Sequence, residues 1–252
     1  MRITRLIRSI LQPIFQKTRL DMRALQWRLE ALGVRHAMLS AVLSQDDSPH
    51  GPNERLLDLA ESIITRARNI ELSLLADRGA PPIVHVWPGE HYRVLAALIE
   101  EVKPRSVVEI GTFKGTGSLA MLQGIPDGGK LTTVDILPWD QIPETLIKES
   151  DFWDGRFEQI LCDFGEPKIT RKHADLLRGA EIIFIDASKD GVFEKNLIDN
   201  FSAIDMTPGT LLIFDDIRQW EMLDIWRGIQ HPKLDITSFG HFSGTGIVEW
   251  SG

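Results

Sequence analysis

Five short apolar runs without polar alternation constrain the fold of this chain more than any other feature. Helical stretches separate them, and they span Ser106–Ile110, Leu131–Ile136, Phe157–Leu161, Ile182–Ile185 and Leu211–Phe214. A strand without polar alternation is buried on both faces, as in a parallel sheet that helices cover on both sides. The pattern therefore predicts a doubly wound α/β domain.

The C-terminal stretch "LDITSFGHFSGTGIVEW", from Leu234 to Trp250, has a different pattern. It predicts two adjacent strands joined by a glycine-containing turn, which close the sheet as an antiparallel hairpin. Together with the five earlier runs this gives a mostly parallel seven-stranded sheet. A helix over Gly89–Glu101 is expected to precede the first strand.

Residues 1–82 lack this alternation and are expected to form a helical N-terminal extension, separate from an α/β domain over residues 83–252. The turn-forming stretch "SQDDSPHGPN" at residues 44–53 predicts a linker. Asn53 is a suitable N-cap for a helix over Glu54–Asp77, and Pro81 and Pro82 end that helix.

The charge distribution bears on partners and location. The net charge is −8, which argues against a nucleic-acid partner, although residues 1–35 carry eight basic and two acidic residues. That basic, leucine-containing start could touch an anionic membrane surface, cover an active site or pack on a second chain, and dimerisation is favoured. No segment has the apolar length of a membrane span, and Arg8 and Pro13 disrupt a signal-peptide pattern. A single cysteine, Cys162, excludes an internal disulfide and suits a reducing cytoplasm.

The stretch "VVEIGTFKGTGSLAM", from Val107 to Met121, places a glycine-rich turn between a buried strand and a helix. A nucleotide-phosphate loop would need Lys-Ser or Lys-Thr after Gly117, and Ser118-Leu119 stands there instead. A dinucleotide fingerprint is weak, because Phe113 occupies the place of the second glycine. S-adenosylmethionine fits better, since Glu109 at the strand end suits a ligand that carries a cation.

Two further features agree with that ligand. The backbone amides around Gly111 to Gly117 can bind a carboxylate at the N-terminus of the following helix. Eighteen residues after Gly117, the run "LTTVDI" ends a second strand in Asp135, whose carboxylate can accept both hydroxyls of a ribose.

The glycine-rich segment resembles motif I of the Rossmann-like S-adenosylmethionine methyltransferases, and most closely the Glu-x-Gly-x-x-x-Gly variant of the catechol and caffeoyl-CoA O-methyltransferases. The resemblance covers about residues 83–252. It implies that Glu109 meets the amino group of the cofactor, Asp135 the ribose, and Asp163 in "ILCDFGEP" the adenine amine, with an ordinary loop acid as the alternative for Asp163. The implied cofactor-binding residues are Val86, Trp87, Glu109, Gly111, Thr112, Gly115, Gly117, Ser118, Asp135 and Asp163.

A second group of acids follows the fourth and fifth strands. Asp186 ends "IIFID", and Asp215 and Asp216 end "LLIFDD". Because ligands of open parallel sheets bind at the carboxyl ends of strands, these three acids should meet in one crevice, where they would repel one another. A divalent cation removes that repulsion, and carboxylate oxygens suit Mg²⁺.

Asp186-x-x-Lys189 resembles the Asp-x-x-Lys of metal-dependent O-methyltransferases, in which the aspartate binds metal and the lysine can serve as base. Asp215-Asp216 departs from the Asp-Asn of the catechol and caffeoyl-CoA enzymes and is similar to the acidic pair of macrocin-type sugar O-methyltransferases and of a cephalosporin-hydroxylase-like branch. The implied metal ligands are Asp186, Asp215 and Asp216, and the implied catalytic residues are Lys189 and Asp186. A surface lysine is the alternative for Lys189, and His241 is a rival base.

The sequence therefore predicts transfer of a methyl group from S-adenosylmethionine to a hydroxyl of a small molecule (a natural product, a sugar or a phenolic), assisted by Mg²⁺. Three alternatives stay open: a metal-independent enzyme, an enzyme that methylates nitrogen, and a non-catalytic subunit that binds S-adenosylmethionine. No motif identifies the methyl acceptor.

Overall fold

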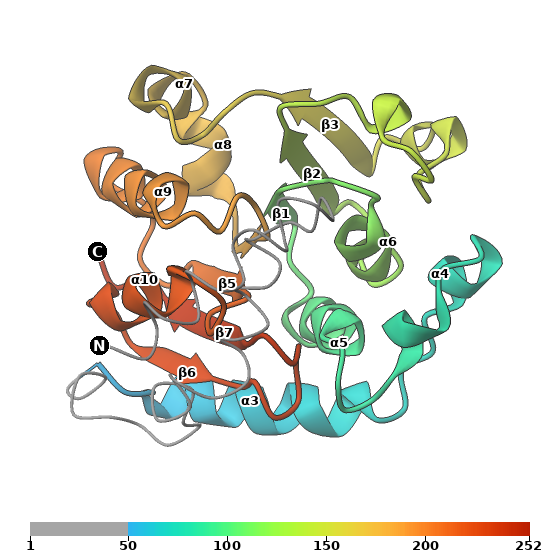
Figure 1. Cartoon of the computed structure of the whole chain (residues 1–252), viewed down its shortest axis with the longest axis horizontal. Helices are drawn as coiled ribbons and strands as arrows, with labels where there is room; N and C mark the ends of the chain where they lie inside the picture. The colour runs from blue at the N-terminus through green and yellow to red at the C-terminus, as the bar shows by residue number, and fades with distance from the viewer. Residues whose placement is uncertain (1–49) are drawn as a thin grey trace, which may run out of the picture. The chain divides into compact units, whose positions relative to one another are not determined.

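A computed structural model describes residues 50–252, and these residues belong to one compact unit. The expected basic N-terminal helix and most of the expected linker lie outside the described residues. Figure 1 shows the described chain as a central sheet with helices on both sides.

The sheet has seven strands in the order β3-β2-β1-β4-β5-β7-β6. Strands β1 to β5 are parallel neighbours, whereas β7 is antiparallel to both β5 and β6. The strands span Ser106–Ile110 (β1), Lys130–Asp135 (β2), Phe157–Leu161 (β3), Ile182–Ile185 (β4), Leu211–Asp215 (β5), Lys233–Asp235 (β6) and Thr245–Glu249 (β7). The predicted fold class, including the C-terminal antiparallel pair, is confirmed.

Two helical layers cover the two faces of this sheet. The helices of one layer are α3 (Glu54–Ala67), α4 (Ser73–Asp77), α5 (Tyr92–Val102) and α6 (Thr116–Leu122), and those of the other are α7 (Pro167–Lys172), α8 (Ala174–Gly179), α9 (Val192–Ala203) and α10 (Met222–Gly228). Single-turn 3-10 helices, η3 (Pro82–His85), η4 (Trp139–Gln141) and η5 (Glu149–Phe152), lie in the connections.

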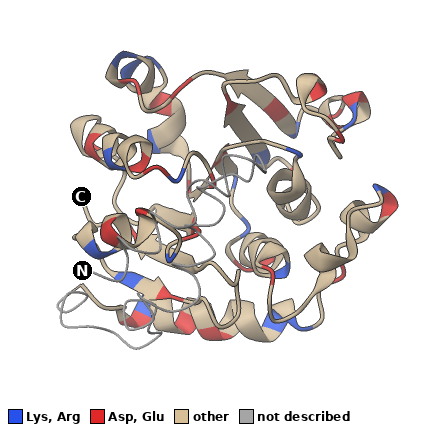
Figure 2. Cartoon of the chain, viewed as in Figure 1, with Lys and Arg blue, Asp and Glu red and all other residues tan. Residues whose placement is uncertain are grey.

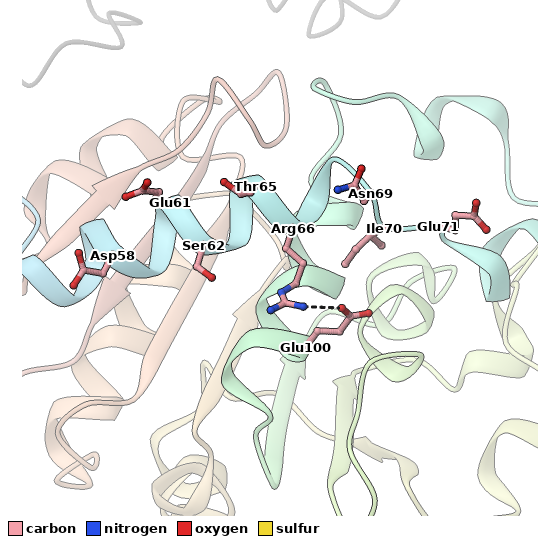
Figure 3. A pocket seen from close by; sticks show the side chains of 9 residues that line it. All are labelled: Asp58, Glu61, Ser62, Thr65, Arg66, Asn69, Ile70, Glu71 and Glu100. Atoms are coloured by element: carbon pink, nitrogen blue, oxygen red, sulfur yellow. Dashed lines mark ion pairs between the residues drawn. The ribbon is translucent and has the colours of Figure 1, made fainter.

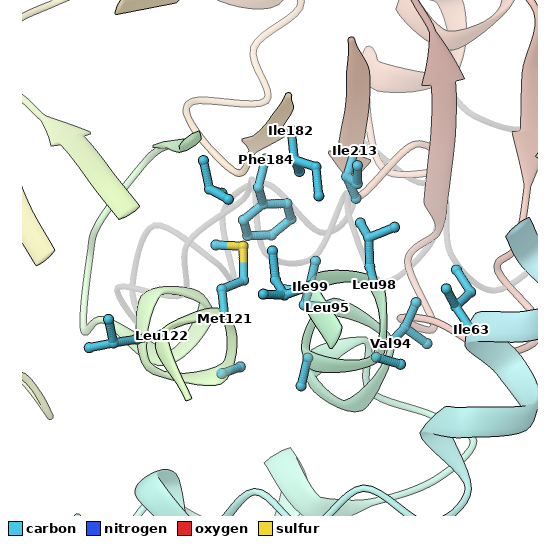
Figure 4. Close-up of a cluster of buried hydrophobic side chains, with 14 of the residues drawn as sticks. Ile63, Val94, Leu95, Leu98, Ile99, Met121, Leu122, Ile182, Phe184 and Ile213 are labelled. Carbon is cyan, nitrogen blue, oxygen red and sulfur yellow. The ribbon is translucent and has the colours of Figure 1, made fainter. Parts of the chain in front are cut away.

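Alternate residues of each central strand face opposite layers, which explains the apolar runs. In β4, Ile182 and Phe184 join the core under α5 and α6, while Ile183 and Ile185 join the core under α8 and α9. Figure 4 shows side chains of α3, α5 and α6 directed at β4 and β5 of the sheet. A strand with two buried faces favours apolar residues at every position, and the polar residues inside these strands, such as Glu109 and Thr133, are buried with hydrogen-bond partners.

The N-terminal helical region differs from the sequence-based expectation in one respect. Asn53 does cap the helix, since its side chain accepts a hydrogen bond from Leu56 N. The expected single helix over Glu54–Asp77 is wrong, because α3 ends at Ala67 and α4 begins at Ser73. Ile70 and Leu72 between them are both buried, and residues two apart cannot share one face of a continuous helix.

Helix α3 packs into the core of the α/β domain. Figure 2 shows charges of both signs along it, and its apolar residues Leu56, Ala60, Ile63 and Ala67 are buried in the same cluster as α5 and the sheet. Residues 54–67, which the sequence analysis assigns to the N-terminal extension, therefore stabilise the domain. The boundary at residue 82 and the role of the extension stay predictions.

This packing predicts a stability difference between two adjacent leucines of α3. Leu56→Ala should lower the free energy of unfolding by about 2–5 kcal/mol, because Leu56 is 0% exposed and its loss leaves a cavity. Leu57→Ala is the matched control, since Leu57 is 50% exposed, and should change stability by less than about 0.5 kcal/mol. Urea unfolding of both variants measures this. Equal effects would mean that α3 does not belong to the core.

Candidate functional site

A cavity of about 370 Å³ opens at the carboxyl ends of β1, β2 and β4. Residues from the glycine-rich loop, from the tip of β2 and from the loops after β3 and β4 form its wall. They include Ile110, Gly111, Phe113, Val134, Asp135, Ile136, Cys162, Asp163, Phe164, Asp186, Ala187, Ser188, Lys189 and Phe193. Of the predicted site residues, this one cavity thus brings together Gly111, Asp135, Asp163, Asp186 and Lys189.

At two glycines of the loop, a side chain would collide with neighbouring atoms. Gly111 has φ +103°, and a Cβ there would lie 1.9 Å from the backbone oxygen of Asp186, so the ends of β1 and β4 come together only through a glycine. Gly115 has φ +82° and stands at the N-terminus of α6. Glycine at these two positions therefore lets the loop pack closely against the end of β4 and against Ile147, while Phe113 of the same loop lines the cavity.

Asp135 at the tip of β2 holds the glycine-rich loop in position. Its Oδ2 accepts hydrogen bonds from the backbone amides of Thr112 (2.9 Å) and Phe113 (3.1 Å), and its Oδ1 accepts one from Leu137 N (3.1 Å). A carboxylate has about four acceptor positions, so Asp135 retains capacity for a ligand hydroxyl. Asp163, on the loop after β3, accepts a hydrogen bond from Gly165 N at 2.7 Å.

Glu109 is buried below the cavity and is not part of its wall. Its carboxylate accepts hydrogen bonds from Ser118 Oγ and from Thr133 Oγ1, the latter at 2.6 Å. A Cβ on Gly117 would come within 2.5 Å of Glu109 Oε1, so Gly117 lets α6 lie directly over this carboxyl group. The predicted contact between Glu109 and the cofactor's amino group stays a prediction, and the observed contacts of Glu109 are with α6 and β2.

Burial raises the pKa of Glu109 to about 8, although the hydrogen bonds from Ser118 and Thr133 oppose the rise. Between about pH 5 and pH 8 the folded chain keeps a proton that the unfolded chain has lost. Stability should therefore fall as pH rises through this window, by up to about 1.4 kcal/mol per pH unit, and level off above it.

Glu109→Gln should remove this dependence, because the amide is neutral at every pH. Urea unfolding of wild type and variant between pH 5 and pH 9 measures the difference. The variant should gain stability relative to wild type as the pH rises to 8. Parallel curves would show that Glu109 is already ionised in the folded chain at pH 5.

The three aspartates predicted to meet at the ends of β4 and β5 do so. Asp186, Asp215 and Asp216 each place a carboxylate oxygen within 4.8 Å of the others. The Nζ of Lys189 lies among them, paired with Asp186 Oδ1, 2.6 Å from Asp216 Oδ2 and 3.6 Å from Asp215 Oδ2. The ammonium of Lys189 therefore offsets the repulsion between the acids.

The backbone around this cluster is unusual. Lys189 and Asp216 are non-glycine residues with φ of +58° and +57°, a conformation that costs free energy and persists only where the surroundings enforce it. Glu194, at the start of α9, is buried and accepts hydrogen bonds from Lys189 N (2.7 Å) and Gly191 N (3.1 Å). Sequence analysis missed Glu194, whose contacts lie within five residues of it and carry no motif.

The charges of the cluster shift one another's pKa values. Burial, together with Asp215, raises the pKa of Asp186. Burial also opposes ionisation of Asp215, but His91, His241 and Lys189 lower its pKa well below the usual value. Burial would lower the pKa of Lys189, yet the three carboxylates raise it above its ordinary value. At neutral pH, Lys189 is therefore an ammonium ion in this arrangement.

Two histidines extend the cluster, although neither stands near a carboxylate in a sequence motif. His241 Nδ1 lies 3.3 Å from Asp216 Oδ1, and its Nε2 lies 3.3 Å from Glu90 Oε2. Burial would lower the pKa of His241, but Asp215 and Asp216 raise it to about 10. His91 Nδ1 lies 3.2 Å from Asp215 Oδ1. No local signal could have found these pairs, because the packing of α5 on the sheet brings His91 to β5 and the pairing of β7 with β5 brings His241 there.

Val86 and Trp87 do not line the cavity. They precede α5, where Gly89 forms an isolated bridge to His241 and Trp87 lies against Phe239 with ring centroids 6.3 Å apart. Their segment therefore adjoins the turn that carries His241.

A larger cavity of about 920 Å³ lies on α3 and the turn after it (Figure 3). Its lining residues form none of the candidate metal-binding clusters of the described chain. Its lining is mostly exposed polar side chains, such as Asp58, Glu61 and Thr65, with Arg66 3.6 Å from Glu100. No strand contributes to it. Its greater volume therefore carries less functional meaning than the chemistry of the smaller cavity.

The residues present fit a divalent cation. Asp186, Asp215 and Asp216 supply three oxygen donors within 4.8 Å of one another, which are the hard ligands that Mg²⁺ prefers. The Lys189 ammonium contacts all three, so cation and ammonium compete for the same oxygens.

Comparison with known proteins shows that the chain is similar to O-methyltransferases. Residues 108–217 match the family described as "Methyltransferase domain". A protein of Mycobacterium sp. (strain KMS) named "Putative O-methyltransferase" is 30% identical over 161 residues, which are 64% of this chain and 60% of that protein. The caffeoyl-CoA O-methyltransferase of Stellaria longipes is 43% identical over 44 residues, 18% of either chain.

Other matches are shorter or concern the fold alone. The transmembrane O-methyltransferase of Propithecus coquereli is 36% identical over 70 residues, so the match spans 26% of that protein and 27% of this chain. A solved structure of a "putative caffeoyl-CoA O-methyltransferase" from Staphylococcus aureus has a TM-score of 0.51 and 17% identity over 78% of this chain and 98% of that chain, which shows a shared fold. These comparisons confirm the resemblance to the Rossmann-like S-adenosylmethionine-dependent O-methyltransferases, and residues 108–217 match the model of the methyltransferase-domain family.

Proposed function

We propose that this chain transfers a methyl group from S-adenosylmethionine to a hydroxyl of a small molecule, with the help of a divalent metal ion. One observation carries the proposal. A single cavity is lined both by the glycine-rich loop with Asp135 and by Asp186 with Lys189, so a cofactor-binding set and an acid–base set face the same space. Substrate and cofactor held in one cavity react as if at high effective concentration.

The cofactor-binding side is assigned as follows. Gly111 leaves backbone exposed, and the N-terminus of α6 offers free amides to the carboxylate of the methionine part. Asp135 accepts hydrogen bonds from the ribose hydroxyls, and Asp163 accepts one from the adenine amine. The exposed Phe113 and Ile136 supply apolar wall beside them.

The acid cluster supplies the reactive side. Asp186, Asp215 and Asp216 would hold Mg²⁺, which lowers the pKa of a bound hydroxyl. Lys189 is the base in this proposal. Its three acidic neighbours hold it protonated, so it can accept the hydroxyl proton only after those carboxylates are neutralised and it has released its own proton to solvent. His241, which also contacts Asp216, is the competing base.

The test is calorimetric titration of S-adenosylmethionine and of Mg²⁺ into wild type and Asp186→Ala. We expect wild type to bind both ligands, and the variant to keep cofactor binding while Mg²⁺ affinity falls at least tenfold through loss of one of three oxygen ligands. A panel of catechols, sugars and polyketides then measures methyl transfer with and without EDTA.

Each alternative function has its own outcome. Methyl transfer that survives EDTA supports a metal-independent enzyme, and transfer to amines alone supports an N-directed one. Cofactor binding without turnover on the panel supports a non-catalytic subunit. Unchanged Mg²⁺ affinity in Asp186→Ala contradicts the metal assignment, and absence of S-adenosylmethionine binding contradicts the whole proposal.

Location and assembly are part of the proposal. Within residues 50–252, no helix has the length and apolar character needed to cross a membrane. We propose a cytoplasmic homodimer, on the basis of the single cysteine and of the leucine-containing N-terminal region. Sedimentation of the full chain and of a chain that begins at residue 50 tests whether residues 1–49 carry the dimer contact.

A further inference from the structure

A second set of metal-binding side chains shares Asp215 and uses residues that the proposed function leaves unassigned. His91, Asp215 and His241 each offer one ligand atom, and these atoms lie within 4.8 Å of one another. His91 Nδ1 is 3.2 Å and His241 Nδ1 is 3.6 Å from the same atom, Asp215 Oδ1. Ligand atoms around a tetrahedral ion with bonds of about 2.0–2.1 Å are roughly 3.3 Å apart, close to both separations.

The buried atoms of this set lack hydrogen bonds. His91 is 1% exposed. Within the described part of the chain its Nε2 has no polar partner, and its Nδ1 meets Asp215 Oδ1 at 3.2 Å without forming a hydrogen bond. Asp215 Oδ1, which His91 Nδ1 faces, is also buried and forms no hydrogen bond within the described residues. Buried polar atoms are almost always paired, because an unpaired one loses its water without compensation. The ion pair between His91 Nδ1 and Asp215 Oδ1 compensates part of this cost, and the absence of a hydrogen bond at either atom leaves both able to bind a cation.

The two oxygens of Asp215 face different clusters. Oδ1 faces the two histidines, whereas Oδ2 lies 3.6 Å from Lys189 Nζ in the aspartate cluster. The histidine side therefore has its own donor set of two imidazoles and one carboxylate. Imidazole nitrogen favours ions such as Zn²⁺, Co²⁺ and Fe²⁺, whereas Mg²⁺ favours oxygen alone.

The surroundings of His241 also suit metal binding. Its Nε2 faces Glu90 Oε2 at 3.3 Å, while its Nδ1 lies 3.6 Å from Asp215 Oδ1 and also contacts Asp216 Oδ1 and the hydroxyl of Ser243. When a metal ion displaces the proton on Nδ1, the Glu90 carboxylate keeps the proton on Nε2, which is the usual arrangement of metal-binding histidines.

We propose that His91, Asp215 and His241 form a site for a divalent first-row transition-metal ion, distinct in its donors from the all-oxygen site proposed for Mg²⁺. Glu90 is a positioning residue of this site, because it orients the ring of His241.

Co²⁺ is the probe that distinguishes the two sites. The full chain, freed of metal by EDTA and dialysis, is titrated with Co²⁺ while visible absorption and paramagnetically shifted imidazole N–H resonances are recorded. Zn²⁺ affinity is measured by calorimetry. Wild type should show shifted imidazole resonances on binding Co²⁺. His91→Gln and His241→Asn should each lose them and lower Zn²⁺ affinity about 100-fold, and Glu90→Gln should lower it about tenfold.

Two control variants should bind Zn²⁺ as tightly as wild type. Asp186→Asn removes a ligand of the oxygen site only. His231→Gln removes a histidine that stacks on Trp250, with ring centroids 4.0 Å apart, away from the proposed ligands. If buried His91→Gln does not fold, His241→Asn decides the question, because its side chain is 19% exposed.

The proposal is overturned if the histidine variants bind Zn²⁺ like wild type, or if Asp186→Asn abolishes the shifted imidazole resonances, since the ion would then lie in the aspartate cluster. None of these measurements uses S-adenosylmethionine or turnover. Failure of this proposal is therefore distinguishable from failure of the proposed methyl transfer.

Discussion

Gly111→Ala should lower the free energy of unfolding by more than about 3 kcal/mol and abolish cofactor binding. A Cβ at this position would lie 1.9 Å from the backbone oxygen of Asp186 and 2.7 Å from its carbonyl carbon. Backbone cannot move aside as a flexible side chain can, so β1 and β4 would have to separate at the floor of the cavity. The φ of +103° adds conformational strain to this clash.

Gly128→Ala is the matched control for the part of the destabilisation that comes from backbone conformation alone. Gly128 has φ +77°, but a Cβ there meets no atom within 4 Å. It should therefore show only the cost of the left-handed conformation, about 1–2 kcal/mol. Urea unfolding of the two variants, with calorimetric titration of S-adenosylmethionine, separates strain from collision. Equal destabilisation would mean that β1 and β4 are not in the close contact described.

Lys189→Met should lower the free energy of unfolding by about 3 kcal/mol at pH 7, because it leaves three carboxylates without their shared ammonium. This loss of stability should shrink toward pH 5. Burial and Asp215 raise the pKa of Asp186, so its carboxylate is the first of the three to be protonated. Stability is therefore regained as the pH falls, in the direction opposite to ordinary acid unfolding.

The same variant should bind Mg²⁺ more tightly than wild type, although methyl transfer falls through loss of the proposed base. The ammonium no longer competes for the carboxylate oxygens, so Mg²⁺ should restore more stability to Lys189→Met than to wild type. Lys195→Met is the control. Its ammonium pairs with Asp199 at 2.6 Å on the surface, where both side chains are more than 60% exposed, and its removal should cost less than about 1 kcal/mol. Weaker Mg²⁺ binding by Lys189→Met would contradict the competition.

The strands and the acids at their tips were predictable from local sequence. A run without polar alternation is buried on both faces, which indicates a parallel sheet. An acid that ends such a run lies at the carboxyl end of the strand, so Asp135, Asp186 and Asp215 reach the same edge. Helix boundaries were less predictable, as the break between α3 and α4 shows, because it depends on what Ile70 and Leu72 pack against.

The sequence by itself determined the sheet class, the glycine-rich loop and the gathering of acids at one edge, since each follows from residue order within one strand and the turn after it. Only the tertiary structure decided that Glu109 is buried below the cavity, that Lys189 contacts three carboxylates at once, and that His91 and His241 meet at Asp215. Those contacts join elements far apart in the chain. They depend on the order in which strands pair and on how helices pack over them, and no local pattern encodes either.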